Sequence, residues 1–168
     1  EMMGTACMMR IGSTGVWGAA VALGIVGLLA NRIEVPLGWG VHFLFGNAIT
    51  FAGLRLLGAA PTALAVSIAS SWTVLLWQHP WAWLVWSLEG AVVCALWRRV
   101  PPLTADLVFW ALAGAPLLFA TYGGVMGMDG TSLWLVVAKQ AVNGLANILI
   151  AELMYLAILL GPMRRRLT

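Results

Sequence analysis

A stripe of polar side chains runs through the apolar sequence between residues 132 and 160. Its members are Lys139, Gln140, Asn143 and Asn147. Since consecutive helical residues are rotated by about 100°, these four lie within about a third of the circumference and share one face. The rest of the run is mainly Leu, Val, Ile and Ala, which places the stripe inside a membrane. Such a stripe could bind, orient or gate a small ligand.

Glu89 and Lys139 carry opposite charges at matching expected depths. With a rise of about 1.5 Å per residue, Glu89 lies about 12 Å and Lys139 about 10 Å from the expected outer ends of their helices. An ionisable side chain at the centre of a membrane helix costs about 2.5–3.5 kcal/mol or more, so each calls for a partner. We expect either a buried ion pair that fixes helix register or a shared polar pocket open to the outside.

Asn47 is expected to reach a similar depth on a neighbouring helix. The full set of candidate ligand-binding residues is Lys139, Glu89, Gln140, Asn143, Asn47 and Asn147. His42 and His79 are interpreted as interfacial residues, because two unmatched histidines form neither a zinc nor a haem site. Arg55 and Glu152 are expected near one interface, either paired or each reaching the lipid headgroups.

Composition sets the class of protein. Of 168 residues, 62% are hydrophobic and only 9% are charged, against about 25% charged in soluble domains. The basic residues stand mainly at the ends of hydrophobic runs, which disfavours nucleic-acid binding. No nucleophile, metal or phosphate-binding motif is present, so the sequence predicts no catalytic residue, no metal site, no cofactor and no enzyme within this chain.

The hydrophobic runs predict an all-α, six-helix transmembrane bundle. A membrane helix needs about 20 apolar residues. The expected spans are 14–33, 37–57, 59–77, 81–97, 106–123 and 132–160. A cytoplasmic N-terminal segment, 1–13, precedes this membrane domain, and a basic exit, 161–168, follows it.

The distribution of arginine indicates the orientation. With both termini in the cytoplasm, every arginine except Arg32 falls on the cytoplasmic side, as the positive-inside rule requires. The small residues of the first run, including Gly18 and Gly24, allow close helix packing, either within the bundle or against another membrane subunit.

Several short phrases, spread over residues 37 to 155, carry a family resemblance. They include Phe45-Gly46-Asn47, Trp77-Gln78-His79-Pro80-Trp81, Leu88-Glu89-Gly90, Asp106 with Phe109-Trp110, and Lys139-Gln140 with Asn143-Gly144. In their order and spacing they resemble the N-terminal membrane sensor regions of bacterial histidine kinases and diguanylate cyclases. The six-span architecture is also similar to the substrate-binding subunits of energy-coupling-factor vitamin transporters.

The resemblance implies a sensory domain in the bacterial cytoplasmic membrane. Such a domain would bind a small molecule, or sense membrane state, and relay the signal to a cytoplasmic output domain beyond residue 168, through which it would form a homodimer. Its expected partners are the lipid bilayer and the small-molecule ligand, with no nucleic acid. The alternative is a substrate-binding subunit of a transporter, which would associate with the other transporter subunits. A purely structural membrane subunit is the third reading.

Overall fold

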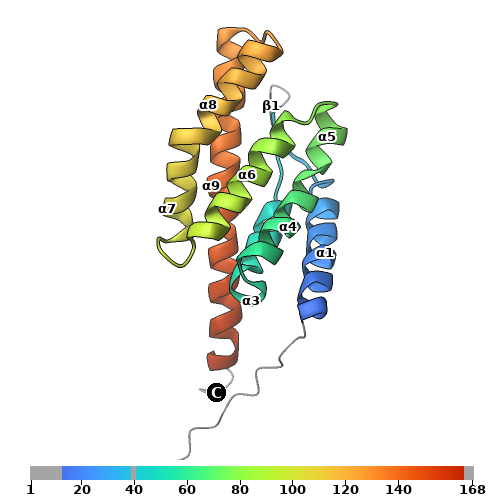
Figure 1. The fold of residues 1–168 in the computed structure, drawn as a ribbon, viewed down its shortest axis with the longest axis vertical. Coiled ribbons are helices and arrows are strands. Elements are labelled where there is room, and N and C mark those ends of the chain that lie inside the picture. Colours follow the sequence, from blue (N-terminus) through green and yellow to red (C-terminus); the bar gives the residue numbers. More distant parts are fainter. Residues whose placement is uncertain (1–12, 39–40, 165–168) are drawn as a thin grey trace, which may run out of the picture.

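The described chain is a bundle of helices with one short β-hairpin (Figure 1). The computed structural model describes residues 13–38 and 41–164, with side chains for 14–36 and 42–160. The longer helices are α1 (Ser13–Ala30), α4 (Ala59–Ser70), α6 (Trp81–Leu96) and α9 (Gly130–Arg164). The start of α1, at Ser13, and the end of α9, at Arg164, lie at the same end of the molecule (Figure 1). Most of the predicted segment 1–13, and the end of the basic exit from 165 onward, lie outside the described residues.

Three helical stretches of the described chain are long and apolar enough to cross a membrane. They are Ala59–Trp77, Pro102–Val125 and Gly130–Leu160, and two shorter apolar helices cover Thr14–Ala30 and Trp81–Leu96. The stretch Ala59–Trp77 comprises α4 and α5 (Trp72–Trp77). The mostly helical fold is therefore confirmed, with three stretches that could cross a membrane, while the full set of six crossings and their orientation stay predictions.

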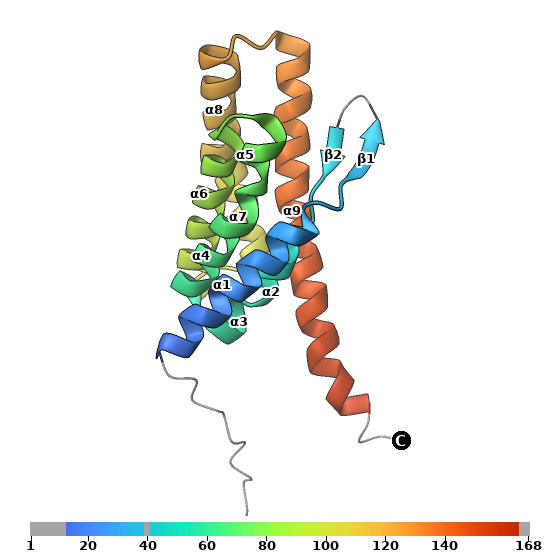
Figure 2. The same cartoon turned by 90° about the vertical axis from the view of Figure 1, so that its right-hand side faces the viewer.

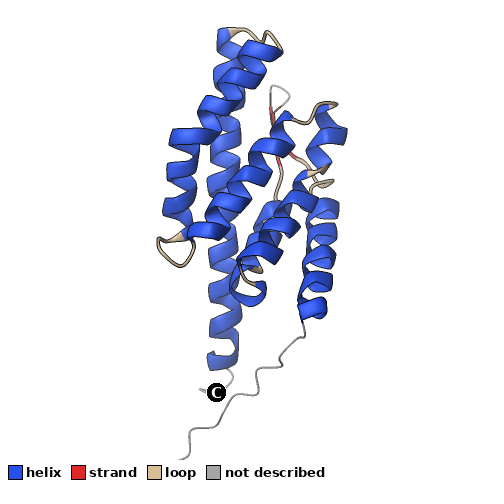
Figure 3. Cartoon of the chain, viewed as in Figure 1, coloured by secondary structure: helices blue, strands red, loops and turns tan. Residues whose placement is uncertain are grey.

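The predicted continuous span over 37–57 is wrong. Strands β1 (Val35–Gly38) and β2 (Val41–Phe43) form an antiparallel hairpin there, followed by the short helices α2 (Gly46–Ala52) and α3 (Leu54–Leu57) (Figure 3). At about 1.5 Å per residue, α2 and α3 together extend only about 18 Å, against about 30 Å of hydrocarbon. The fold is thus helical with one hairpin rather than all-α.

Asparagine side chains replace the helical hydrogen bonds that this segment lacks. The Leu44 N–H donates to Oδ1 of Asn143 (2.9 Å), and Nδ2 of Asn143 donates back to the Leu44 carbonyl (2.8 Å). Asn147 donates to the same carbonyl and accepts from the Ala48 N–H, while Asn31 accepts from the Gly46 N–H. Non-helical backbone is tolerated at membrane depth only when its polar groups are satisfied inside the protein. The amide stripe on α9 therefore accounts for the departure from a helix.

Glycines bring α1 and α2 into backbone contact. A Cβ atom added at Gly27 would lie 2.8 Å from the Gly46 carbonyl oxygen, and one added at Gly46 would overlap the Gly27 carbonyl oxygen. Gly24 faces Ile68 of α4, whereas Gly18 has open space beside it. The small residues at Gly24 and Gly27 thus serve packing within the bundle.

Two π-helical turns interrupt the helix that begins with α7 (Pro102–Phe109). They are η1 (Trp110–Gly114) and η2 (Phe119–Val125), separated by α8 (Ala115–Leu118). The Ala115 N–H donates to the Trp110 carbonyl, five residues back, just before Pro116, whose ring would clash with the preceding turn of a regular α-helix. Each π-turn changes the angle at which its side chains leave the helix, and such turns are frequent at functional sites. Trp110 and Tyr122 are buried residues of these two turns.

Asp129 caps the start of α9. Its Oδ1 accepts a 2.9 Å hydrogen bond from the Ser132 N–H, which lowers the pKa of Asp129 below its ordinary value. The contribution of this cap to stability is present above the pKa of the unfolded chain and is lost as pH falls through the lower folded value.

We expect an NMR titration of the Asp129 carboxyl to show the lowered pKa. D129N, which can still cap but does not titrate, is expected to remove this part of the acid sensitivity; an unshifted pKa would contradict the cap.

Candidate functional site

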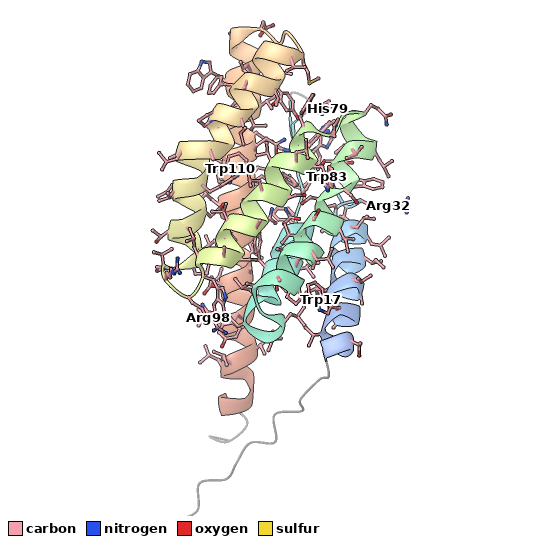
Figure 4. All side chains as sticks on the ribbon, in the orientation of Figure 1. Trp17, Arg32, His79, Trp83, Arg98 and Trp110 are labelled. Carbon is pink, nitrogen blue, oxygen red and sulfur yellow. The ribbon has the colours of Figure 1, made fainter. Side chains whose placement is uncertain are left out.

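A cavity of about 250 Å³ opens near the end of the bundle that carries His79 (Figure 4). The β-hairpin, the α5–α6 turn, the η2 turn with the loop after it, and α9 all contribute to its wall. Its lining residues are His42, Trp77, His79, Tyr122, Met126, Met128, Val136, Lys139 and Gln140. An apolar pocket with a few convergent polar groups is the usual form of a small-molecule site.

Lys139 supplies the positive charge of this cavity. Its Nζ is buried and makes no hydrogen bond to any described residue. It lies 4.7 Å from the ring centroid of Trp77 and 5.8 Å from that of Trp86. Contacts of this kind contribute about 0.5–2 kcal/mol each but leave the three N–H donors unsatisfied. The ammonium group is therefore held in place with its hydrogen-bonding capacity unused.

The expected ion pair between Lys139 and Glu89 is absent from the described residues. The ion pair found there joins Arg55 to Glu152 (2.9 Å), and Nδ1 of His42 lies 3.0 Å from a carboxylate oxygen of Glu34, a contact that is ionic only when His42 is protonated. Matching depth along two helices does not bring the two side chains together, because the Lys139 side chain turns toward Trp77 and the Glu89 side chain turns toward Trp110.

Further unsatisfied polar atoms face or adjoin the same cavity. Gln140 is only 2% exposed, and its Oε1 has no hydrogen-bond partner among the described residues; the same holds for Nδ1 of His79. His79 stacks edge-on against Tyr122, with 5.0 Å between ring centroids. Partial burial lowers the pKa of His79 below its ordinary value, so its imidazole is neutral at pH values near 7.

The turn between α5 and α6 positions two lining residues. Gln78 adopts a left-handed conformation with φ of 57°, and its side chain donates to the Leu75 carbonyl (2.5 Å). This geometry ends α5 and brings Trp77 and His79 to the cavity wall. His42 of β2 also lines the cavity, and its Nδ1 contacts Glu34, the residue just before β1.

The structure divides the six predicted ligand-binding residues into three groups. Lys139 and Gln140 line the cavity. Asn143 and Asn147 bond to the backbone of Leu44 and Ala48, and Asn47 exchanges hydrogen bonds with the Ser70 hydroxyl (3.1 and 3.2 Å). Glu89 lies elsewhere in the core. The sequence reasoning also missed Trp77, His79 and Tyr122 as lining residues, although the Trp77-Gln78-His79 phrase within the family resemblance was a usable signal.

Glu89 forms an acidic pair with Asp106, which is not among the six predicted ligand-binding residues. Trp110 Nε1 donates a 3.0 Å hydrogen bond to Glu89 Oε1, and the Asp106 carboxyl lies beside both groups. Glu89 is 1% exposed and Asp106 is fully buried. Gly144 of α9 covers the pair so closely that a Cβ atom there would overlap Glu89 Oε1 and Trp110 Nε1. The spacing of Asp106 and Trp110, four residues apart on one helix face, could have indicated this contact.

Arg55 and Glu152 form the paired alternative of the two left open by the sequence. Nη2 of Arg55 donates to both carboxylate oxygens of Glu152 (2.9 and 3.1 Å), and the arginine lies over the Tyr155 ring. Each side chain is about one-third exposed. The pair joins α3 to α9 near the end of the molecule that carries Arg98 (Figure 4).

Comparison with protein-family models, with curated protein sequences and with solved structures finds no match to this chain. The function proposed below therefore depends on the geometry of the cavity and of the helix that carries it.

Proposed function

We propose that this chain is a membrane-embedded sensory domain that binds a small organic anion in the cavity lined by Lys139. One observation carries the proposal: Lys139 Nζ, Gln140 Oε1 and His79 Nδ1 are all unsatisfied within the described residues, and all three residues line one cavity. Leaving such buried groups unpaired costs about 1–3 kcal/mol each. A ligand with an anionic acceptor and a hydrogen-bond donor would satisfy them.

The rest of the wall defines the body of the ligand. Trp77, Tyr122, Met126, Met128 and Val136 offer aromatic and flexible apolar surface. Methionine side chains adapt to irregular apolar shapes and make favourable contacts with aromatic rings. The ligand class is therefore a small carboxylate with an apolar or aromatic body that also carries a hydrogen-bond donor.

Helix α9 provides the route from the cavity to the other end of the molecule. It carries Lys139 and Gln140 at the cavity and continues to Arg164, about 37 Å further along at about 1.5 Å per residue. Figure 2 shows its lower part standing away from the other helices. The proposed orientation puts this end in the cytoplasm, because Arg55, Arg98 and Arg99 belong to the elements that meet there. The membrane would be the bacterial cytoplasmic membrane.

Binding is tested by the thermal unfolding of the full chain in lipid nanodiscs. The probes are 4-hydroxybenzoate, 4-hydroxyphenylacetate and indole-3-acetate, which carry a hydrogen-bond donor as well as the carboxylate, and each is compared with its neutral amide. We expect the acids to stabilise the wild type, by about 2.7 kcal/mol at a concentration 100 times Kd. K139M keeps an apolar stem without the charge and is expected to weaken acid binding at least about tenfold, or about 1.4 kcal/mol. The matched control is R55Q, which removes a basic side chain outside the cavity.

Two results would contradict anion binding: no response to any of the acids, or equal responses to acids and amides. The sensory role has a separate readout, because a ligand shifts a conformational equilibrium only if it binds the two states with different affinities. Hydrogen exchange in the 145–160 part of α9 should change when a stabilising acid is bound. Binding without that change, together with passage of the acid across the membrane with partner subunits, would favour the transporter alternative.

A further inference from the structure

The acidic pair, Glu89 and Asp106, has unmet hydrogen-bonding needs inside the bundle. Within the part of the chain that the structure describes, no partner satisfies Glu89 Oε2 or either carboxylate oxygen of Asp106. Trp110 supplies the one hydrogen bond that the pair receives with good geometry, at 3.0 Å. Two buried carboxylates would carry two negative charges side by side, and each would cost several kcal/mol without compensation.

None of the described elements packed around the pair brings a compensating cation to it. Helices α4, α5 and α8 and the η1 turn contain no charged residue. Helix α9 presents Gly144, while its ionisable residues on either side are engaged elsewhere: Lys139 at Trp77 and Glu152 at Arg55. On α6, Cys94 packs in an apolar cluster with Val66, Ala105 and Ile148.

The geometry of this pair suits a proton better than a metal cation. Na⁺ and divalent ions need several oxygen ligands arranged around them. Here one of the four carboxylate oxygens already accepts from an N–H group, and no cluster of three or more metal-binding side chains occurs among the described residues. A proton needs only two oxygens, and two adjacent carboxyls that cannot both ionise commonly share one.

We propose that Glu89 and Asp106 form a proton-binding site in the interior of the bundle, in which the two adjacent carboxyl groups share a proton beside the indole of Trp110. One carboxyl carries the proton and donates it in a hydrogen bond to an oxygen of the other. The Trp110 N–H then stabilises the remaining negative charge. This site is separate from the cavity and does not depend on the ligand proposed for it.

Trp86 lies on the same face of α6 as Glu89 and close to the cavity lysine. It is 1% exposed, lies three residues before Glu89 on α6, and has its ring 5.8 Å from Lys139 Nζ. Residues three apart share a helix face. A change in protonation of the acidic pair would therefore act next to a ring that contacts the cavity lysine.

Infrared spectroscopy of the full chain in lipid nanodiscs tests the proton directly. We expect the wild type at neutral pH to show the carbonyl-stretching band of a protonated carboxylic acid, shifted in D₂O. This band should be lost in the double variant E89Q–D106N and reduced or shifted in each single variant. E152Q is the matched control, because Glu152 is partly exposed and bonded to Arg55, so the band should persist there.

Two outcomes would overturn the proposal. One is a folded wild type without the band, and the other is a band that survives unchanged in both single variants. A wild type that lacks the band and gains thermal stability in sodium chloride over choline chloride would indicate a metal-cation site instead. K139M should leave the band in place, so that failure of the anion-binding proposal and failure of this one are distinguishable.

Discussion

N143A is expected to destabilise the protein by about 2–4 kcal/mol, since it removes both hydrogen bonds that the Asn143 side chain makes to Leu44. The Leu44 N–H would lose its partner, while its carbonyl would keep only the 3.1 Å bond from Asn147. Leu44 is fully buried, so water is excluded from replacing the lost partner. Equilibrium unfolding in mixed micelles, with and without N143A, measures the difference.

S71A is the control for this prediction. The Ser71 hydroxyl also donates to a backbone carbonyl (2.7 Å), but that carbonyl belongs to Ile68, three residues back, and Ser71 directly follows the end of α4. Losing such a local bond leaves the helix intact and is expected to cost less than about 1 kcal/mol. An N143A variant no less stable than S71A would show that the segment after the hairpin does not depend on the two hydrogen bonds between Asn143 and Leu44.

G46A is the second substitution with a large expected effect. The added methyl group would overlap the Gly27 carbonyl oxygen and press on the Asn31 side chain, which itself accepts from the Gly46 N–H. Overpacking usually costs about 1–3 kcal/mol, and we expect at least the upper part of that range because the obstructing atom is main chain and cannot rotate away.

G18A is the matched control on α1. Nothing lies within 4 Å of a Cβ atom added at Gly18, and replacing an exposed helical glycine with alanine usually gains about 0.5–1 kcal/mol. The two variants therefore change unfolding temperature in opposite directions. A G46A variant as stable as the wild type would mean that α1 and α2 do not cross as closely as described.

The long apolar helices were predictable because each long apolar run is a local property of the sequence. The runs 59–77 and 132–160 match the helical stretches Ala59–Trp77 and Gly130–Leu160. The segment 37–57 is equally apolar, yet its conformation depends on Asn143 and Asn147, about a hundred residues further along. Hydrophobicity indicates that a segment can enter a membrane but not which side chains will satisfy its backbone.

The site was predictable in part for the same reason. The shared face of Lys139 and Gln140 follows from helical periodicity, and both line the cavity. The direction in which a long side chain turns is not set by spacing, so of the two alternatives for Lys139 and Glu89 the ion pair does not form, and Glu89 is not among the cavity residues. Hydrophobic periodicity also could not predict the π-turn at Trp110, because that turn depends on its tertiary environment as well as on Pro116.

The hydrogen bonds between Leu44 and Asn143 limit the order in which the chain can fold during its synthesis. A ribosome delivers the Leu44 peptide group 99 residues before the Asn143 side chain that satisfies it. Until α9 emerges, the segment between β2 and α2 has no internal partner for these groups, and burying them in lipid would be costly. If the chain inserts into a membrane as proposed, this segment reaches its folded position only after α9 has been synthesised. Helix α9 therefore completes the folding of this segment. A chain that ends before Asn143 would leave the Leu44 N–H without its hydrogen-bond partner.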